Sequence, residues 1–262
     1  MDPATLIGFA ISIIALFVFM TLEGVSPGAL IFLPAIVLVV IATFGAAAAS
    51  QTLDDLKKVG SWFKMALMPA KVPPVSDRIA TLVGLAEKAR KEGLLALESQ
   101  VKEIQDPFLK RGLQMGIDGT DPEELRAVLE SEIAAKKAED KVAAKFMNAM
   151  GGYAPTIGIV GCIVGLMNVM ANLNEPASLG PKIAAAFVAT LWGLISANFM
   201  WLPVGTRLKR ISELELERMT VVMEGMLAVQ AGSQPRLLGE RLRAMVPAHA
   251  LPKAPKEEVE AA

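Results

Sequence analysis

Residues 151–174 read GGYAPTIGIVGCIVGLMNVMANLN, a run without a charged side chain. A helix needs about 20 predominantly apolar residues to cross the hydrocarbon core of a bilayer, and this run is long enough. Small or weakly polar residues nevertheless recur in it, namely Pro155, Thr156, Gly158, Gly161, Cys162 and Gly165. The three glycines are spaced three, four and seven residues apart, which gives one smooth helix face on which another helix can pack closely.

Charged residues are sorted by position along the whole chain of 262 residues, 53% of which are hydrophobic. Four windows contain none of them: residues 3–22, 24–53, 146–174 and 183–206. Within these windows we predict four transmembrane helices, at residues 5–21, 28–49, 155–173 and 183–203. The predicted fold is an all-α integral membrane protein with a helical cytoplasmic domain inserted between the second and third transmembrane helices.

The distribution of Lys and Arg predicts the orientation in the membrane. Residues 50–150 contain sixteen of them and residues 207–262 contain nine, whereas the loop at 21–27 contains none and the loop at 174–182 contains only Lys182. Because cytoplasmic loops carry the excess of positive charge, both charged regions and both termini are predicted to be cytoplasmic. The expected location is the inner cell membrane.

Five segments follow from this layout. They are residues 1–49 (transmembrane helices 1 and 2), 50–150 (a cytoplasmic domain facing a partner), 151–206 (helices 3 and 4), 207–246 (cytoplasmic C-terminal helices) and 247–262 (a flexible tail). After a linker at 69–77 with a Ser or Asp capping signal, apolar spacing predicts a helix over 78–103. Further helices are predicted within 106–119, from a Thr120 or Asp121 cap toward the membrane, over 205–232 and over 235–245.

Several classes of function are disfavoured by composition. A single cysteine excludes an internal disulfide, and a single histidine, His249 in a Pro-rich tail, leaves little for metal binding or acid–base chemistry. The net charge of −1 gives no reason to expect nucleic-acid binding. We find no catalytic constellation, so we expect neither an enzyme nor a cofactor.

The predicted transmembrane helices also contain no ionisable Asp, Glu, Lys, Arg or His side chain. Such groups usually mark an ion or proton path through a membrane, so a self-contained transporter is hard to build from this chain. Close packing among the four helices accounts for the small residues by themselves, because such faces are common in membrane proteins. It does not account for the large charged domain.

Five blocks of the sequence, in this order, resemble the A subunits of flagellar motor stators, the MotA/PomA family within the MotA/TolQ/ExbB proton channel group. They are ARKEGLLALE (89–98), DPFLKRGLQMGIDGTDPEELR (106–126), APTIGIVGCIVGL (154–166), AAAFVATLWGLISANFMWLPVGTRLK (184–209) and MEGMLAVQAGSQPRLLGERLRAMVP (223–247). The resemblance covers nearly the whole chain.

The resemblance implies a homopentamer around two copies of a B subunit, whose single transmembrane helix carries an ion-binding aspartate. Protons, or alternatively Na⁺, would load that aspartate and move the A subunits against B. The cytoplasmic domain would then push the rotor through the switch protein FliG. Membrane lipid is the remaining expected partner, and the missing acid of this chain would be supplied by the B subunit.

The resemblance also assigns roles to residues. Pro155 and Pro203 take the positions of the functional prolines of the family, Thr190 matches the threonine that faces the aspartate, and Thr156 is placed on the same ion path. Sodium-type members usually carry a second threonine where this chain has Cys162. A thiol is a poor ligand for Na⁺, because hard cations prefer oxygen, so a proton is favoured over sodium.

Arg90 and Glu98 match the family's charges that meet opposite charges on the rotor. Their spacing of eight predicts that they lie on one helix face with Leu94 between them. A solvated helix surface with ordinary i,i+4 pairs is the competing interpretation.

Two further readings stay open: a TolQ/ExbB-type energiser of another envelope machine, and a membrane scaffold that conducts nothing. The first is disfavoured because two predicted spans, rather than one, precede the large cytoplasmic part.

Overall fold

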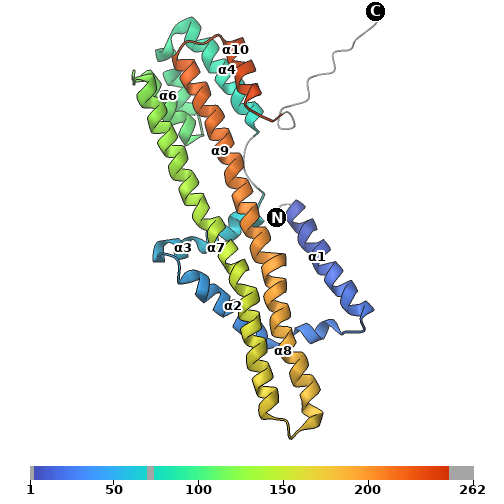
Figure 1. The fold of residues 1–262 in the computed structure, drawn as a ribbon. Helices are drawn as coiled ribbons and strands as arrows, with labels where there is room; N and C mark the ends of the chain where they lie inside the picture. Colours follow the sequence, from blue (N-terminus) through green and yellow to red (C-terminus); the bar gives the residue numbers. More distant parts are fainter. Residues whose placement is uncertain (1–2, 70–73, 248–262) are drawn as a thin grey trace, which may run out of the picture. The chain divides into compact units, whose positions relative to one another are not determined.

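The computed structural model describes residues 3–69 and 74–247, and every regular element in these ranges is helical (Figure 1). The predicted all-α fold is therefore confirmed for this part of the chain. The predicted tail lies outside it from residue 248 onward, as do His249 and residues 70–73 of the linker. Packing divides the chain into two compact units, each with its own apolar core.

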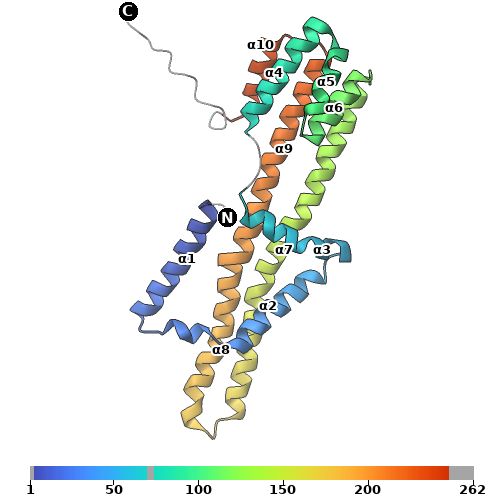
Figure 2. The ribbon, with the colours of Figure 1, turned by 180° about the vertical axis from the view of Figure 1, so that it is seen from behind.

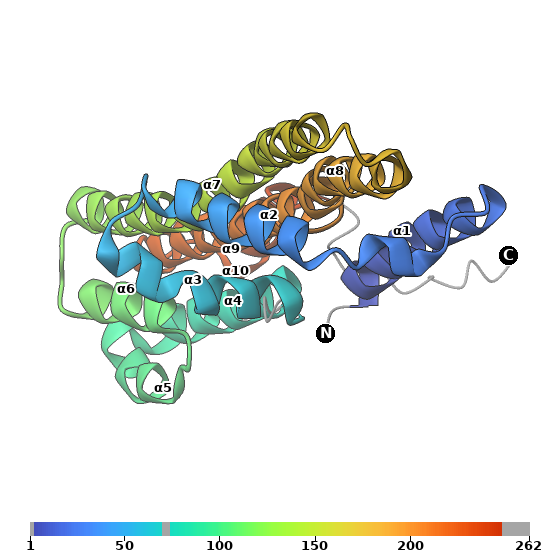
Figure 3. The same ribbon diagram turned by 90° about the horizontal axis from the view of Figure 1, so that it is seen from below.

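The first unit comprises the described residues before 70 together with Glu139–Ile211. Its elements are α1 (Pro3–Leu22), the 3-10 helix η1 (Pro27–Leu30), α2 (Leu33–Ala48), α3 (Leu53–Leu67), α8 (Pro176–Ser196), the π turn η3 (Ala197–Trp201) and parts of α7 (Pro122–Ala171) and α9 (Leu202–Gln230). In this unit α7 and α8 run side by side to a short turn, and α2 packs across α8 (Figures 2 and 3).

Among the described residues, three helical stretches are long and apolar enough to cross a membrane: Thr5–Leu22 and windows inside Pro122–Ala171 and Pro176–Gln230. The second predicted span is different. Residues 28–32 do not belong to its α-helix, because α2 begins at Leu33. Pro34 occupies the first turn, where a backbone N–H would have no acceptor within the helix, so its missing N–H costs nothing there. With 16 residues, α2 is only about 24 Å long at 1.5 Å per residue.

The third and fourth predicted spans are parts of longer helices. α7 has 50 residues and continues through Pro155 without interruption. α8 begins at Pro176 and leads through the π turn into α9. The predicted limits at 155, 183 and 203 therefore lie inside continuous helices, whereas the limit at 173 lies two residues beyond the end of α7.

Aromatic side chains organise the core of the first unit. The ring of Phe146 on α7 lies 5.8 Å from Trp62 of α3 and 6.0 Å from Phe44 of α2, measured between ring centroids. The indole N–H of Trp192 on α8 donates a 2.7 Å hydrogen bond to the Leu30 carbonyl, which fixes η1 against α8. Three helices thus meet at one ring, and η1 is held by one half-buried donor.

α3 is absent from the predicted helices, although its start has a sequence signal. Thr52 accepts from the Asp55 N–H while the Asp55 carboxylate accepts from the Thr52 N–H, which forms a capping box. Val59, Trp62 and Ala66 form its buried face. The spacing of three and four between these residues is that of an amphipathic helix.

The second unit contains residues 74–138 and 212–247 of the described chain. Its elements are α4 (Val75–Glu92), η2 (Leu94–Leu97), α5 (Glu98–Glu103), α6 (Pro107–Ile117), the first part of α7, the last part of α9 and α10 (Pro235–Ala244). Its core includes Leu82, Leu109, Leu129 and Met226, which are fully shielded from solvent or nearly so. The predicted segment 50–150 is therefore divided between the two units.

The helix predicted over 78–103 is wrong, because Gly93 interrupts it with φ of +85°. Glycine adopts this left-handed region at little cost, so α4 ends there and the chain restarts as η2 and α5. The predicted Ser or Asp cap is also wrong. Pro74 occupies the N-cap position, and Ser76 and Asp77 lie inside the first turn of α4.

The other predicted helices of this unit are confirmed. Asp106 caps α6 by accepting from two backbone N–H groups, and Asp121 accepts from the Glu123 N–H at the start of α7. α9 ends before Gly232, which has φ of +68°, and α10 follows as predicted.

Candidate functional site

The contact between α7 and α8 is built on glycine. A Cβ added at Gly158 would lie 2.8 Å from the Ala189 carbonyl oxygen, and one added at Gly193 would lie 2.5 Å from the Ala154 carbonyl oxygen. These obstacles are backbone atoms, which cannot rotate away as a side chain can. Only glycine therefore fits at these two positions while the helices keep their separation.

Gly161 and Gly165 continue the same contact along α7. A Cβ at Gly165 would lie 2.6 Å from the Cβ of Ala186, and one at Gly161 would lie 2.9 Å from the Cβ of Ala189 and 2.8 Å from Leu38 on α2. The three glycines singled out in the sequence thus all lie where α7 meets its neighbours. Small residues of this kind let membrane helices approach closely.

Thr190 and Cys162 lie at this glycine contact. The Thr190 hydroxyl is half-buried and lies 3.4 Å from the Gly158 carbonyl oxygen. This is longer than the usual 2.5–3.0 Å for an O–H···O bond, so the hydroxyl is held weakly. Cys162 follows Gly158 by four residues, which places it on the same face of α7, and its side chain is half-buried. A hydroxyl and a backbone carbonyl thus meet at the helix contact, and helical spacing places a thiol on the same face of α7.

Thr156 is different from Thr190. It is exposed, and its hydroxyl donates a 2.8 Å hydrogen bond to the Tyr153 carbonyl of its own helix. No hydrogen bond joins it to Thr190 in the described ranges. A threonine hydroxyl that bonds to the preceding turn is satisfied locally.

Pro155 lies inside α7, one turn after Gly151. Proline has no N–H, so the Gly151 carbonyl loses its usual helical donor, yet the helix neither ends nor restarts there. A Cβ at Gly151 would collide with Leu202 of α9, and the Pro155 Cα lies at the contact with Gly193. The proline therefore lies in a stretch of α7 that packs closely against α8 and α9.

Pro203 follows the π turn η3, in which the Leu202 N–H donates to the Ala197 carbonyl five residues earlier. Because Pro203 cannot donate, the Phe199 carbonyl has no α-helical partner, and a π turn is one way to accommodate such a break. A cavity of about 360 Å³ opens beside this turn. It is lined by Thr5, Gly8, Phe9 and Ser12 of α1 and by Asn198, Phe199, Pro203 and Arg207.

This region contains no Asp, Glu, Lys, Arg or His between residues 146–174 or 183–206. In the described ranges, no group of three or more His, Cys, Asp or Glu side chains could hold a metal ion. The site therefore offers hydroxyl, thiol and carbonyl groups but no carboxylate that could carry a proton.

Arg90 and Glu98 are both exposed in the second unit. The prediction that they share one helix face is wrong, because Gly93 separates the last turn of α4, with Arg90, from Glu98 at the start of α5. Glu98 forms an exposed 3.4 Å ion pair with Lys102. The two residues thus lie on either side of a turn that Leu94 and Leu95 form.

Polar contacts around α3 are a feature that no sequence motif predicted. Lys58 forms a 2.8 Å ion pair with Glu139 of α7, and the hydrogen bond and the attraction of this carboxylate raise the pKa of Lys58. Arg207 donates from Nε to the Ala66 carbonyl at 2.6 Å and from Nη2 to the Met68 carbonyl at 3.3 Å. Arg207 thereby satisfies carbonyls at the end of α3.

A second network lies in the other unit and is centred on Glu224 of α9. Its carboxylate accepts from Arg126 at 2.7 Å and from Arg241 at 2.9 Å, while only 13% of its side chain is exposed. The hydrogen bond to Glu224 raises the pKa of Arg126. Because the network joins α7, α9 and α10, we assign it a structural role.

Known proteins resemble the chain over nearly its whole length. Residues 100–221 match the MotA/TolQ/ExbB proton channel family. Motility protein A of Bacillus subtilis is 35% identical over 248 residues, which is 95% of this chain and 92% of that protein.

Solved structures share the fold. The structure of C. jejuni MotAB has a TM-score of 0.92 and 28% identity, and the match covers 97% of this chain and 100% of that one. The flagellar MotAB stator complex from Bacillus subtilis has a TM-score of 0.89 and 34% identity, with 95% and 97% covered.

Proposed function

The chain belongs to the MotA/TolQ/ExbB proton channel family, and from this premise we propose that it is the A subunit of a flagellar motor stator. In this role it couples ion flow through a complex with a B subunit to torque on the rotor. The observation that carries the proposal is the likeness to a MotAB stator complex over 95% of the chain, with a TM-score of 0.89. The family is one of channel-type stator proteins, not of enzymes.

The mechanism starts from the missing carboxylate. The B subunit supplies an acid on its transmembrane helix, and this chain supplies the wall that the acid meets, with the Thr190 hydroxyl and the Gly158 carbonyl at its centre. A charged carboxylate is far more costly to bury in an apolar wall than a protonated one. Ion loading therefore changes which position of the acid against the wall is stable. That change moves A relative to B.

We assign the transported ion as the proton, with Na⁺ as the alternative. Cys162 supports this assignment because its half-buried thiol borders the glycine contact where a second hard oxygen would suit Na⁺. A proton needs no coordination shell, so one carboxylate and a hydroxyl suffice. No cofactor is required in either case.

Swimming speed at fixed proton-motive force distinguishes the two ions. Speed should be the same with and without Na⁺, and it should fall when the proton gradient is collapsed. A Cys162→Ser variant tests the residue itself in the same assay, because it replaces the thiol by a hard hydroxyl oxygen of nearly the same shape. Strict dependence on Na⁺ in the wild-type protein would contradict the assignment.

We place four helices in the inner cell membrane, with α1, α2 and the apolar parts of α7 and α8–α9 as the spans, and both termini in the cytoplasm. The excess of Lys and Arg in residues 50–150 and 207–262 supports this orientation. Labelling of introduced cysteines in a Cys162→Ser background tests this orientation. Cysteine at Ser26 should react from outside the cell, and cysteine at Ser61 only after permeabilisation; the reverse pattern refutes the orientation.

For the assembly we propose five copies of this chain around two B subunits, in contact with membrane lipid and with FliG on the rotor. The rotor contact is the exposed turn that carries Arg90 and Glu98, because exposed charges steer association. The mass of the purified complex tests the stoichiometry. Charge reversal at Arg90 should reduce torque in a strain with weakened rotor charges, and unchanged torque there would contradict the contact.

A membrane scaffold that conducts nothing makes a different prediction. In a stator, Thr190→Ala and Pro203→Leu should each reduce ion flux and swimming while the complex still assembles. A scaffold would keep swimming intact in both variants. Assembly is followed by co-purification with the B subunit, so a loss of folding is recognised separately.

A further inference from the structure

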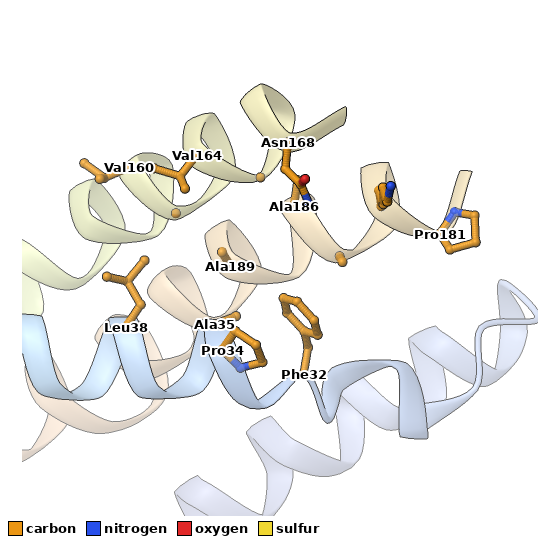
Figure 4. A pocket seen from close by; sticks show the side chains of 14 residues that line it. Phe32, Pro34, Ala35, Leu38, Val160, Val164, Asn168, Pro181, Ala186 and Ala189 are labelled. Carbon is orange, nitrogen blue, oxygen red and sulfur yellow. The ribbon is translucent and has the colours of Figure 1, made fainter. Parts of the chain in front are cut away.

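A groove of about 690 Å³ lies between α2 and the α7–α8 pair (Figure 4). Leu38 of α2 and Phe32, the N-cap residue before α2, form one wall, Val164 of α7 lies on the other, and Ala186 and Ala189 of α8 lie along the floor. The groove is almost wholly apolar, and it lies within the unit that carries the membrane-crossing helices. It therefore suits hydrocarbon.

The dimensions of the groove suit acyl chains. It extends along α7 from Val160 to Asn168, a length of about 12 Å at 1.5 Å per residue. Flexible acyl chains can fill an apolar groove of this length and volume.

One end of the groove is polar. Lys182 lines it with 27% of its side chain exposed, and its ammonium lies 3.8 Å from the carboxylate of Glu175, whose side chain is 67% exposed. Asn168 lies at the same end, and its Oδ1 accepts from Asn172. The Asn168 NH₂ has no hydrogen-bond acceptor among the residues that the structure describes. The rim thus presents a cation, an amide donor and an anion together.

We propose that this groove binds a phospholipid with a zwitterionic ethanolamine headgroup. The acyl chains occupy the apolar groove, the phosphate accepts from Lys182 and Asn168, and the primary ammonium donates to Glu175. An anionic headgroup would satisfy Lys182 but would meet repulsion from Glu175. A choline headgroup has no N–H to donate. The proposal rests on the proposed membrane placement and is independent of the ion path.

Native mass spectrometry of the stator complex in mild detergent tests the proposal. Phosphatidylethanolamine, phosphatidylglycerol and phosphatidylcholine are titrated separately, and the ethanolamine lipid should bind about tenfold more tightly than the others. Lys182→Gln should weaken it by about tenfold. Glu175→Gln should remove the preference for ethanolamine over glycerol headgroups. Lys57→Gln, an exposed lysine elsewhere in the same unit, should change nothing.

A pair of neighbouring alanines on α8 separates occupancy of the groove from a general effect of added bulk. Ala185 lines the groove, whereas Ala184 is exposed and does not belong to the lining. Ala185→Phe should abolish the bound lipid, and Ala184→Phe should retain it. Equal retention in both variants would overturn the assignment of the site.

Two other results would also overturn it. If phosphatidylglycerol binds as tightly as phosphatidylethanolamine to the wild-type complex, the headgroup assignment is wrong. If no lipid binds and Ala185→Phe lowers the number of A subunits per complex, the groove holds a second copy of the chain. A complex that binds the lipid but carries no ions would refute the stator function and leave this inference standing.

Discussion

Substitution of Gly158 by alanine tests the close contact of α7 with α8 most directly. The added Cβ would lie 2.8 Å from the Ala189 carbonyl oxygen, 3.1 Å from the Thr190 Cα and 3.2 Å from the Gly193 Cα. Ordinary contact begins near 3.4 Å, so α8 has to move by roughly half an ångström, and overpacking of this kind costs about 1–3 kcal/mol.

Gly152→Ala is the matched control, because Gly152 lies on the same helix and an added Cβ there would meet nothing within 4 Å. Both substitutions gain helix propensity, about 1 kcal/mol each, so the difference between them isolates the contact. Denaturant titration of the purified complex should give Gly158→Ala a free energy of unfolding about 1–3 kcal/mol below that of the control.

The same displacement moves Thr190 away from the Gly158 carbonyl. Swimming speed should therefore fall in Gly158→Ala and not in Gly152→Ala. Equal stability and equal speed of the two variants would refute the reasoning, because they would show that α7 and α8 are separated by more than the structure indicates.

Three further predictions concern the rest of the chain. Glu224→Gln should lower the free energy of unfolding by about 1.5–3 kcal/mol, because two arginines lose a shielded carboxylate; Glu240→Gln, at an exposed i,i+4 pair, should cost less than about 0.5 kcal/mol in the same denaturation assay. Gly93→Ala should destabilise the turn after α4 by about 1–2 kcal/mol, because its φ of +85° disfavours a Cβ, whereas Gly84→Ala within α4 should not destabilise it. The ion pair with Glu139 raises the pKa of Lys58, so it stabilises the folded state at pH values below 10.5, the ordinary lysine pKa, and this contribution is lost as the pH rises through the higher folded-state pKa. Protection of the α3 amides from hydrogen exchange should therefore fall at alkaline pH in the wild-type protein. Lys58→Met should remove this pH dependence, and its persistence in the variant would contradict the assignment.

Much of the fold could be predicted because its determinants are local. Pro122 at the first turn of α7, Asp106 as the cap of α6 and Gly232 after α9 are each read from a few neighbouring residues. Long charge-free runs predict apolar helices in the same way. The start of α3 also had a local signal, the Thr52–Asp55 capping box, which the apolar pattern alone did not reveal.

Local signals were misleading where two of them competed. Apolar spacing on both sides of Gly93 favoured one helix, but the glycine adopts a left-handed conformation and divides it. This separates Arg90 from Glu98. In the same way, Pro34 delays the start of α2 in a stretch whose hydropathy is uniform.

By itself, the sequence determined that the chain is helical, that its apolar stretches contain no acid, and that small residues form one face of α7. These properties depend on neighbours in the chain and on composition. Only the tertiary structure decided that Gly158 meets Ala189 and Gly193, that Arg207 closes the end of α3, and that a groove with Lys182 at its rim lies beside α2. Such contacts join residues far apart in the sequence, and their distances depend on how whole helices pack.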